Sequence, residues 1–332
     1  MKQILSDLFS HQILTYDVAY NALKQMADGS MSEIEMSAFV SAYIMRFPTL
    51  SEIKAFRDAL LSLAVPVKLE HDNLIDVCGT GGDGKNTFNI STASAFVLAG
   101  AGYKVAKHGN YGVSSVSGSS NILEYFGYKF TNQSDALNKQ LDQANICFMH
   151  APQFHPAMKQ IAPVRRTLKI KTFFNMLGPM VNPARPQYQL VGVYNAELAR
   201  LYSYLYQAQN VQYSIIHSTS GYDEISLTSE VRINTPHGDF SYLPSELGFE
   251  KTHEDEITGG NNVDEAALMF EKILTNNGTQ AQTNVLLANT AAAIRTFHPN
   301  KNWEECKEIA AESLHSGKAY QKFKKLIETS SL

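Results

Sequence analysis

The stretch most able to do chemistry runs from Asp76 to Thr92 and reads Asp-Val-Cys-Gly-Thr-Gly-Gly-Asp-Gly-Lys-Asn-Thr-Phe-Asn-Ile-Ser-Thr. A short apolar strand, Leu74 to Cys78, leads into it, and a small-residue helix is expected from Ser94. Glycine lets a backbone approach an anion closely, and unpaired N–H groups at a helix start can bind phosphate. A tight turn needs one glycine, whereas this turn has four. The pattern therefore favours a phosphate site over a purely steric turn. The four glycines are Gly79, Gly81, Gly82 and Gly84.

Two nucleotide-binding motifs partly match this stretch, and both fail. Gly79-x-Gly81-x-x-Gly84 fits the dinucleotide fingerprint, but the next predicted strand ends in Lys107 where an acid should bind the ribose. Reading on to Lys85 gives most of a P-loop, but Asn86 occupies the position of the magnesium-binding Ser or Thr. Neither nicotinamide binding nor a P-loop is predicted.

Composition narrows the class of protein. The chain has 332 residues, of which 44% are hydrophobic and 18% charged, as in ordinary globular proteins. Its net charge of -4 disfavours general nucleic-acid binding. Cys78, Cys147 and Cys306 form no close pair, which suits a reducing compartment. With no signal peptide or membrane span in the pattern, a cytoplasmic location is expected.

The period of the apolar residues predicts two kinds of structure. Residues 1 to about 65 read as helices, with starts at Thr15, at the capping box Ser32-x-x-Glu35 and at the capping box Thr49-x-x-Glu52. From Asn73 onward strands alternate with helices, which predicts an α/β domain over 66–332 around a central, mostly parallel sheet. Ligands should then lie at the carboxyl ends of the strands. Strands are expected at 74–78, 103–107, 146–150, 188–194, 211–217 and 224–234, and helices near 92–101, 119–126, 135–143, 155–163, 196–209, 263–275, 282–296 and from Trp303.

A second polar loop follows the strand that ends at Lys107. Lys107 can place a compact positive charge on a phosphate. The hydroxyls of Ser114, Ser115 and Ser119 precede a predicted helix, and their density favours an anion site over simple helix capping. His108 is expected to be packed or hydrogen-bonded, so we give it no proton-transfer role.

Two charged pairs have open interpretations. Asp223-Glu224 follows a predicted strand, and in an extended chain the two side chains point to opposite faces, so each could hold one magnesium ion. A solvated loop explains the acids equally well. Arg165-Arg166 could recognise a carboxylate through a planar guanidinium, or could be surface charge. His150 and His155 are expected to pack or cap, because no acid or cysteine lies at metal-ligand spacing.

Taken together and in order, these motifs resemble the anthranilate phosphoribosyltransferase family. The resemblance covers nearly the whole chain, including the N-terminal helical pattern, and its central motifs are highly specific. The motifs are Gly79–Gly84, Thr87–Thr92, Lys107–Asn110, Ser114-Ser115, His155–Met158, Ala162–Arg166, Asn175-x-Leu-Gly-Pro179 with Asn182-Pro183, and Asp223-Glu224-Ile225.

The resemblance implies a helical small domain over 1–65, completed by a segment near 160–185, and a homodimer joined through the small domains. It implies that 5-phosphoribosyl 1-diphosphate (PRPP) binds between the domains with two Mg²⁺ ions per site. The phosphoribosyl group would pass to anthranilate in tryptophan biosynthesis. Membrane and nucleic-acid partners are not expected.

Roles carry over only at positions that match the family's motifs. PRPP would be bound by Gly79, Gly82, Asp83, Thr87, Asn89, Ile90, Ser91, Thr92, Lys107, Ser115 and Ser119, with Lys107 also stabilising charge. Magnesium would be held by Ser91, Asp223 and Glu224. Anthranilate would be bound by Gly79, Asn110, Arg165 and Gly178.

One loop departs from the family pattern. The usual Arg-Ala after Lys107–Asn110 is Tyr111-Gly112 here, and the usual Ala-Asp after Gly118-Ser119 is Ser120-Asn121. One positive and one negative charge are therefore both absent. Their joint loss is neutral if the two charges pair, whereas affinity falls if the arginine contacts a ligand.

The implied reaction calls for charge neutralisation and alignment rather than a general base, because diphosphate leaves readily and an aromatic amine is neutral at pH 7. Three alternatives stay open on the sequence. They are a pyrimidine nucleoside phosphorylase-like enzyme, a noncatalytic nucleic-acid-binding relative, which the net charge disfavours, and a phosphoribosyltransferase with another acceptor.

Overall fold

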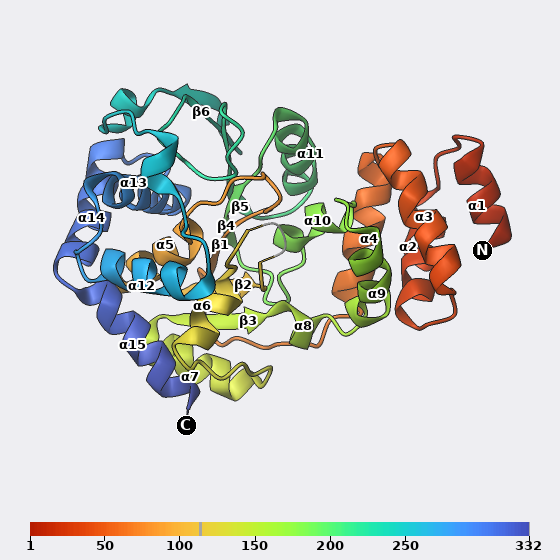
Figure 1. Cartoon of the computed structure of the whole chain (residues 1–332), viewed down its shortest axis with the longest axis horizontal. Helices are drawn as coiled ribbons and strands as arrows, with labels where there is room; N and C mark the ends of the chain where they lie inside the picture. Colours follow the sequence, from red (N-terminus) through yellow and green to blue (C-terminus); the bar gives the residue numbers. More distant parts are fainter. Residues whose placement is uncertain (113–114, 332) are drawn as a thin grey trace. The chain divides into compact units, whose positions relative to one another are not determined.

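The computed structural model describes residues 1–112 and 115–331, and the chain divides into two compact units (Figure 1). The first unit contains Met1–Pro66 and Ala151–Arg185, and the second contains Val67–His150 and the chain from Pro186 onward. Ser114, one of the predicted anion-binding serines, lies outside the described residues. Within those residues, no helix is both long enough and apolar enough to cross a membrane.

The first unit is built of helices. Thr15, Ser32 and Thr49 cap α2, α3 and α4 as predicted, because each side chain accepts the N–H of the third residue of its helix. α1 lies within the region predicted to be helical, but the sequence gives no start signal for it, and it has no side-chain cap. The helices are α1 (Lys2–Phe9), α2 (Tyr16–Ala27), α3 (Glu33–Met45), α4 (Leu50–Ser62), α8 (Ala151–Phe154), α9 (Met158–Leu168) and α10 (Phe174–Leu177), followed by the 3₁₀ turn η1 (Gly178–Met180).

Aromatic rings join the two chain segments of the first unit. Phe173, from the second segment, stacks on Phe56 of α4 with the ring centroids 4.5 Å apart, and meets Tyr43 of α3 edge-on at 5.4 Å. All three rings are buried. Burying a large apolar side chain contributes about 1.5–3 kcal/mol, so this cluster accounts for the association of 151–185 with the N-terminal helices.

A buried carboxylate fixes the start of α4. Glu52 is fully buried, and its carboxylate forms a 2.6 Å ion pair with Arg46 and accepts the N–H of Leu14 at 3.0 Å. Burial alone would raise the pKa of Glu52, but Arg46 and the N–H groups of Thr49 and Leu14 hold it below its ordinary value. The capping box predicted from sequence thus also carries a buried ion pair.

The second unit is organised around a seven-stranded sheet in the order β3-β2-β1-β4-β5-β6-β7. The first five strands along the chain are parallel, and the last two extend the sheet antiparallel. Each of these five lies within two residues of its predicted range, so the mostly parallel sheet is confirmed. The strands are β1 (Ile75–Gly79), β2 (Val105–Gly109), β3 (Ile146–His150), β4 (Tyr188–Gly192), β5 (Gln212–Ser218), β6 (Val231–Thr235) and β7 (Gly238–Tyr242).

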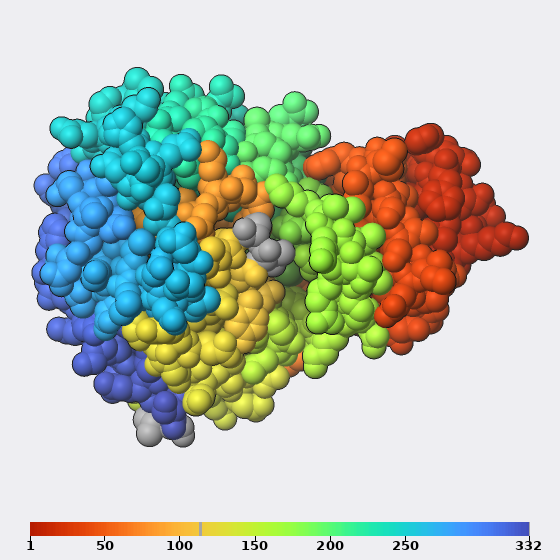
Figure 2. All heavy atoms as spheres, in the orientation of Figure 1, coloured from red at the N-terminus to blue at the C-terminus, as the bar shows by residue number. Residues whose placement is uncertain are grey.

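Helices cover both faces of this sheet. α5 and α13 pack on each other and on the central strands, with α14 and α15 outside α5, whereas α11 lies against β5 (Figure 1). At the surface, α6 and α12 lie side by side (Figure 2). The helices are α5 (Ile90–Gly100), α6 (Ser119–Tyr125), α7 (Ser134–Ala144), α11 (Ala196–Gln207), α12 (Val263–Leu274), α13 (Gln280–Phe297), α14 (Trp303–His315) and α15 (Lys318–Ser330), with the 3₁₀ turns η2 (Pro244–Leu247) and η3 (Glu254–Ile257).

One predicted strand is wrong over most of its length. The sequence favours a strand over 224–234, but only Val231–Thr235 pairs in the sheet. Leu227 has φ +59°, and the buried side chain of Asn289 binds both the N–H and the C=O of Ile225. Side chains therefore take the backbone groups that a strand would use, and 223–230 forms a compact turn.

Candidate active site

The strand order changes direction between β1 and β4. The chain moves from β1 to β2 on one side of the sheet, while β4 pairs with β1 on the other side. Gly79 and Gly192, the last residues of these two strands, stand opposite each other. The loops after such strands lead away in opposite directions, and α/β sheets bind ligands in the resulting crevice. The glycine segment predicted to bind phosphate begins at this point.

Sterics explain the glycines of this segment. Gly81, Gly82 and Gly84 have φ between +67° and +76°, a region that other residues rarely adopt. Gly79 is required for a different reason, since a Cβ there would lie 2.4 Å from a carboxylate oxygen of Asp223. The N–H of Gly81 donates to the same oxygen at 2.6 Å. The glycine segment and the acid pair, 142 residues apart in sequence, are therefore in direct contact.

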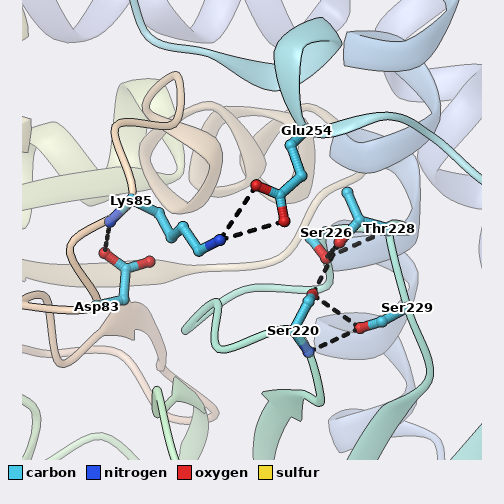
Figure 3. A network of polar contacts seen from close by, with 7 residues as sticks. All are labelled: Asp83, Lys85, Ser220, Ser226, Thr228, Ser229 and Glu254. Carbon is cyan, nitrogen blue, oxygen red and sulfur yellow. Dashed lines mark hydrogen bonds and ion pairs between the residues drawn. The ribbon is translucent and has the colours of Figure 1, made fainter.

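A segment that the sequence analysis did not assign to the site holds the glycine segment in place. The Lys85 ammonium lies 3.2 Å from both carboxylate oxygens of Glu254, and the N–H of Lys85 donates to Asp83 (Figure 3). The N–H of Gly259 donates to the Asn86 carbonyl at 2.6 Å. The sequence signal for this contact is Gly259, because a Cβ there would lie 2.3 Å from the carbonyl oxygen of Thr87.

The start of α5 follows directly. Asn89 is the N-cap, so Ile90, Ser91 and Thr92 form the first turn, where backbone N–H groups lack helical partners. The Asn89 side chain donates to the carbonyl of Ser117 at 3.0 Å, which ties this turn to the second polar loop. The helix begins earlier than the predicted Ser94, so the Asn89–Thr92 motif lies on the helix start rather than before it.

Asp223 and Glu224 are buried in the segment between β5 and β6, and their carboxylates have different partners: Asp223 accepts the N–H of Gly81, whereas Glu224 accepts hydrogen bonds from Ser91. Burial raises the pKa of Asp223 well above its ordinary range, and the charges of Asp83 and Glu224 add to the effect. Burial also raises the pKa of Glu224 to about 7, opposed by Lys107 and by hydrogen bonds from Ser91. The solvated-loop interpretation of the two acids is therefore wrong.

Hydroxyl groups and one amide fix the turn that carries these acids. The Ser218 hydroxyl donates to the Glu224 carbonyl at 2.6 Å, and Asn289 of α13 holds Ile225 through bonds of 3.0 and 2.9 Å. Figure 3 shows a second group in the same turn, in which the Ser220 hydroxyl contacts those of Thr228 and Ser229. The pair is thus held by its backbone.

Lys107 brings positive charge to the same edge of the sheet. It is 2% exposed, and its ammonium donates to the Val77 carbonyl at 2.6 Å. The neighbouring His108 is buried, as expected, and its backbone N–H donates to the carboxylate of Asp76 at 3.3 Å. Lys107 therefore faces β1, and its positive charge acts against the rise in the pKa of Glu224.

The second loop brings the remaining predicted residues of this unit together. The Asn110 carbonyl accepts the N–H of Ser120 at 3.1 Å and lies 3.4 Å from the Ser119 hydroxyl. The Ser115 hydroxyl donates to the carbonyl of Ser117 at 3.2 Å. Asn110 and Ser119 are thus joined directly.

Arg165 and Gly178 belong to the first unit, whereas Gly79 and Asn110 belong to the second. Arg165 lies in the last turn of α9 with its guanidinium 5.6 Å from the centroid of the Phe174 ring. Burial lowers its pKa, so a neighbouring anion would stabilise the charge. Gly178 begins η1.

Comparisons with known proteins agree with this geometry. Residues 71–320 match the glycosyl transferase family a/b domain, and residues 2–64 match the helical bundle domain of the same family. The chain is 49% identical over 328 residues to anthranilate phosphoribosyltransferase of Bacteroides fragilis (strain YCH46), with 99% of each chain covered. The chain belongs to the anthranilate phosphoribosyltransferase family.

Solved structures of this family include ligand complexes. A Saccharomyces cerevisiae anthranilate phosphoribosyltransferase in complex with PRPP and Mg matches with a TM-score of 0.91 at 28% identity, covering 98% of this chain and 96% of that one. A complex of the yeast enzyme with 4-fluoroanthranilate matches at 0.88 and 26% identity, with the same coverage. These relatives do not support the nucleoside phosphorylase or nucleic-acid-binding alternatives.

The residues expected to bind magnesium are suited to it in their chemistry. Across the described ranges, no group of three or more His, Cys, Asp or Glu side chains is arranged to hold a metal ion by itself. Asp223, Glu224 and Ser91 nevertheless offer oxygen atoms, and burial raises the pKa values of the two acids, so a bound cation would favour their ionised forms. Magnesium fits such a site, since it is commonly bound by one or two carboxylates together with water and substrate phosphates.

Proposed function

We propose that the chain transfers the 5-phosphoribosyl group of PRPP to anthranilate, giving N-(5-phosphoribosyl)anthranilate and diphosphate in tryptophan biosynthesis. The observation that carries the proposal is the direct contact between the glycine segment and the buried acid pair, with Lys107 beside Glu224. Backbone N–H groups and an ammonium suit phosphate groups, and carboxylates suit the metal that accompanies them. A substrate with several phosphates uses all of these features.

The proposed PRPP site combines the glycine segment, the first turn of α5 and the second loop. Gly81, Gly82 and Gly84 have left-handed backbone, a conformation that occurs in loops whose N–H groups surround a phosphate. The first turn of α5 adds N–H groups at the positive end of the helix dipole. The residues are Gly79, Gly82, Asp83, Thr87, Asn89, Ile90, Ser91, Thr92, Lys107, Ser115 and Ser119.

Ser91, Asp223 and Glu224 would hold magnesium, and we propose two ions per site because the two carboxylates point to different neighbours. When bound, magnesium neutralises the negative charge that builds on the departing diphosphate. The acid pair itself is fixed before substrate arrives, through Asn289 and Ser218. Little reorganisation is then needed at the moment of reaction.

Lys107 would stabilise charge rather than exchange a proton. An ammonium has three N–H donors, and one of them is occupied by the carbonyl of Val77. That bond fixes the charge at the carboxyl edge of β2, where it can attract a phosphate. Its position next to Glu224 also limits the electrostatic cost of two buried acids.

Arg165, Gly178, Asn110 and Gly79 would bind anthranilate. The planar guanidinium of Arg165 matches a carboxylate, and its lowered pKa makes an anionic partner favourable. The side-chain oxygen of Asn110 already accepts the N–H of Tyr111 at 2.8 Å, so Asn110 presents its NH₂ group to the substrate. Substrate positioning of this kind can contribute a large part of the rate.

The reaction forms one bond and breaks one. The amine nitrogen bonds to C1 of the ribose, the bond from C1 to the diphosphate oxygen breaks with its electron pair leaving on that oxygen, and the nitrogen then releases a proton. The attacking amine is neutral and the leaving group is good, so no general base is proposed. His108 is buried and receives no part in proton transfer.

We further propose a homodimer through the N-terminal helices. Ile34 and Met45 on α3 are 82% and 86% exposed, and Phe9 at the end of α1 is 61% exposed. Large apolar side chains at this exposure fit a surface covered by a second copy. A cytoplasmic location is proposed from the three cysteines, all described and all free thiols.

The test of the function is loss of anthranilate fluorescence on mixing the protein with PRPP and magnesium. Consumption should require both, should stop on chelation, and should release one diphosphate per anthranilate. Phosphate-dependent cleavage of a pyrimidine nucleoside without magnesium would refute the proposal. PRPP turnover with an acceptor other than anthranilate would correct only the acceptor.

A further inference from the structure

Four neighbouring side chains and backbone groups form one connected cluster around the second loop. They are Tyr111, Gly112, Ser120 and Asn121, the same four positions at which the sequence departs from the family pattern. Two come from the loop after β2 and two from the first turn of α6. Their contacts show why they occur together.

Asn121 joins the two sides of the loop. Its side-chain oxygen accepts the N–H of Gly112 at 2.9 Å and the N–H of Gly118 at 2.9 Å. The backbones meet so closely that a Cβ on Gly118 would lie 2.4 Å from the nitrogen of Gly112. A Cβ on Gly112 would lie 2.6 Å from the carbonyl oxygen of Ser115. This close approach of the two backbone segments therefore requires glycine at both positions. It also requires one acceptor, the Asn121 oxygen, that serves both N–H donors.

Tyr111 and Ser120 connect these two backbone segments to His150, the last residue of β3. The Tyr111 hydroxyl donates to Glu124 at 3.0 Å, and its ring meets the ring of His150 edge-on with centroids 5.0 Å apart. The fully buried Ser120 has its hydroxyl 2.9 Å from Nδ1 of His150. His150 stacks on Phe130 at 4.2 Å, so its ring is held on both sides.

The residue fixed by this cluster is Asn110. Its side-chain oxygen accepts the N–H of Tyr111, and its carbonyl accepts the N–H of Ser120. Both donors belong to the cluster. The side-chain amide of Asn110 is therefore oriented by Tyr111, and its backbone is oriented by the first turn of α6.

We propose that Asn121 and Tyr111 are positioning residues that hold the Asn110 amide in the orientation that binds anthranilate. The proposal rests on the role of Asn110 proposed above. Asn121 closes the loop through two neutral hydrogen bonds, and Tyr111 supplies the N–H that occupies the Asn110 oxygen. Hydrogen bonds and ring packing thus fix these positions without a charged side chain at residue 111 or 121.

The experiment compares three variants at Asn121 by steady-state kinetics, with anthranilate and PRPP each varied in turn. Asn121→Ala loses the shared acceptor, and the KM for anthranilate should rise about tenfold, as expected for the loss of two hydrogen bonds. The KM for PRPP should rise clearly less. Asn121→Asp keeps an oxygen at the same place, so its KM for anthranilate should stay within about twofold of the wild type.

Asn302→Ala is the matched control. Asn302 caps α14, and its side-chain oxygen accepts the N–H of Glu305 at 2.9 Å, so its loss removes a comparable bond from the same unit. Its melting temperature should fall as in Asn121→Ala, but its KM values should not change. If Asn121→Ala does not fold, Asn121→Gln replaces it, because one added methylene displaces the oxygen while keeping the amide.

Three results would overturn the proposal: an unchanged KM for anthranilate in Asn121→Ala or Asn121→Gln, an equal rise in Asn302→Ala, or a rise in Asn121→Asp as large as in Asn121→Ala. Failure of the proposed function is distinguishable, because the wild type itself would then not consume anthranilate with PRPP.

Discussion

Glu224→Gln should make the protein more stable while removing its activity. Glu224 is buried, and burial raises the pKa of its carboxyl to about 7. The ionised side chain therefore destabilises the folded state at neutral and higher pH. Glutamine has nearly the same shape and keeps an oxygen that can accept the hydrogen bonds of Ser91, but it is never ionised.

The magnitude follows from the pKa. A folded value of about 7 against the ordinary 4.5 corresponds to about 3 kcal/mol, at 1.4 kcal/mol for each tenfold change in the protonation equilibrium. Because the folded state binds this proton more tightly, the cost is absent below about pH 4.5, grows as the pH rises toward 7, and is complete above it. The attraction to Lys107 is already contained in this pKa, so the net stabilisation expected from the neutral glutamine at pH 8 is about 2–3 kcal/mol.

Urea denaturation at pH 8 and pH 5, without magnesium, measures this difference. The variant should be more stable at pH 8 and should lose most of that advantage at pH 5. Its PRPP- and magnesium-dependent turnover should fall roughly a hundredfold. Glu250→Gln, which removes an exposed acid from the same unit, should change neither quantity. Equal destabilisation by Glu224→Gln at both pH values would refute the reasoning.

Three further substitutions test other parts of the structure. Burial lowers the pKa of His155 to about 4, so between pH 7 and pH 5 the wild type should lose about 2 kcal/mol that His155→Gln does not lose; parallel urea midpoints would contradict this. Arg46→Met leaves the Glu52 carboxylate buried without its ion-pair partner and should lower the free energy of unfolding, measured by calorimetry, by about 3–5 kcal/mol. Adding Glu52→Gln should recover most of this loss, and no recovery would argue against the ion pair. Gly79→Ala places a Cβ 2.4 Å from the Asp223 carboxylate, so it should cost about 1–3 kcal/mol and raise the magnesium concentration for half-maximal activity; unchanged metal activation would count against the contact.

The sequence predicts the parts of the fold that local physics determines. Buried parallel strands are nearly continuous apolar runs, and the five that form the core of the sheet were all predictable from them. Capping boxes predicted α3 and α4 because both halves of each box lie within four residues. The strand β7 is short and mostly exposed, with Phe240 and Tyr242 as its only large apolar residues, so the sequence carries little signal for it. The separation of α14 from α15 at Gly317, which has φ +76°, was equally hard to foresee.

The sequence indicates candidate residues for the site but not the contacts between them. Four glycines and two acids indicated phosphate and metal chemistry, but only the fold shows that Asp223 contacts Gly79 and Gly81 directly. The segment around Gly259 was missed, because a glycine that faces another backbone looks in sequence like any turn glycine. Asn289 gave no signal either, since a polar residue inside an apolar helix is informative only when its partner, the Ile225 backbone, is known.

A family motif predicts the role of a backbone segment more directly than the role of a side chain, and the loop at Tyr111 shows why. Where a backbone is proposed to bind, as in the glycine segment, the requirement is conformational, and glycine meets it regardless of its neighbours. Where a side chain is proposed to bind, as at Asn110, the requirement includes the groups that orient that side chain, here the N–H of Tyr111. In this chain the neutral side chain of Asn121 satisfies the backbone donors of Gly112 and Gly118, so these two contacts need no charged residue at position 121. A substitution in such a loop is informative only together with the residues it contacts.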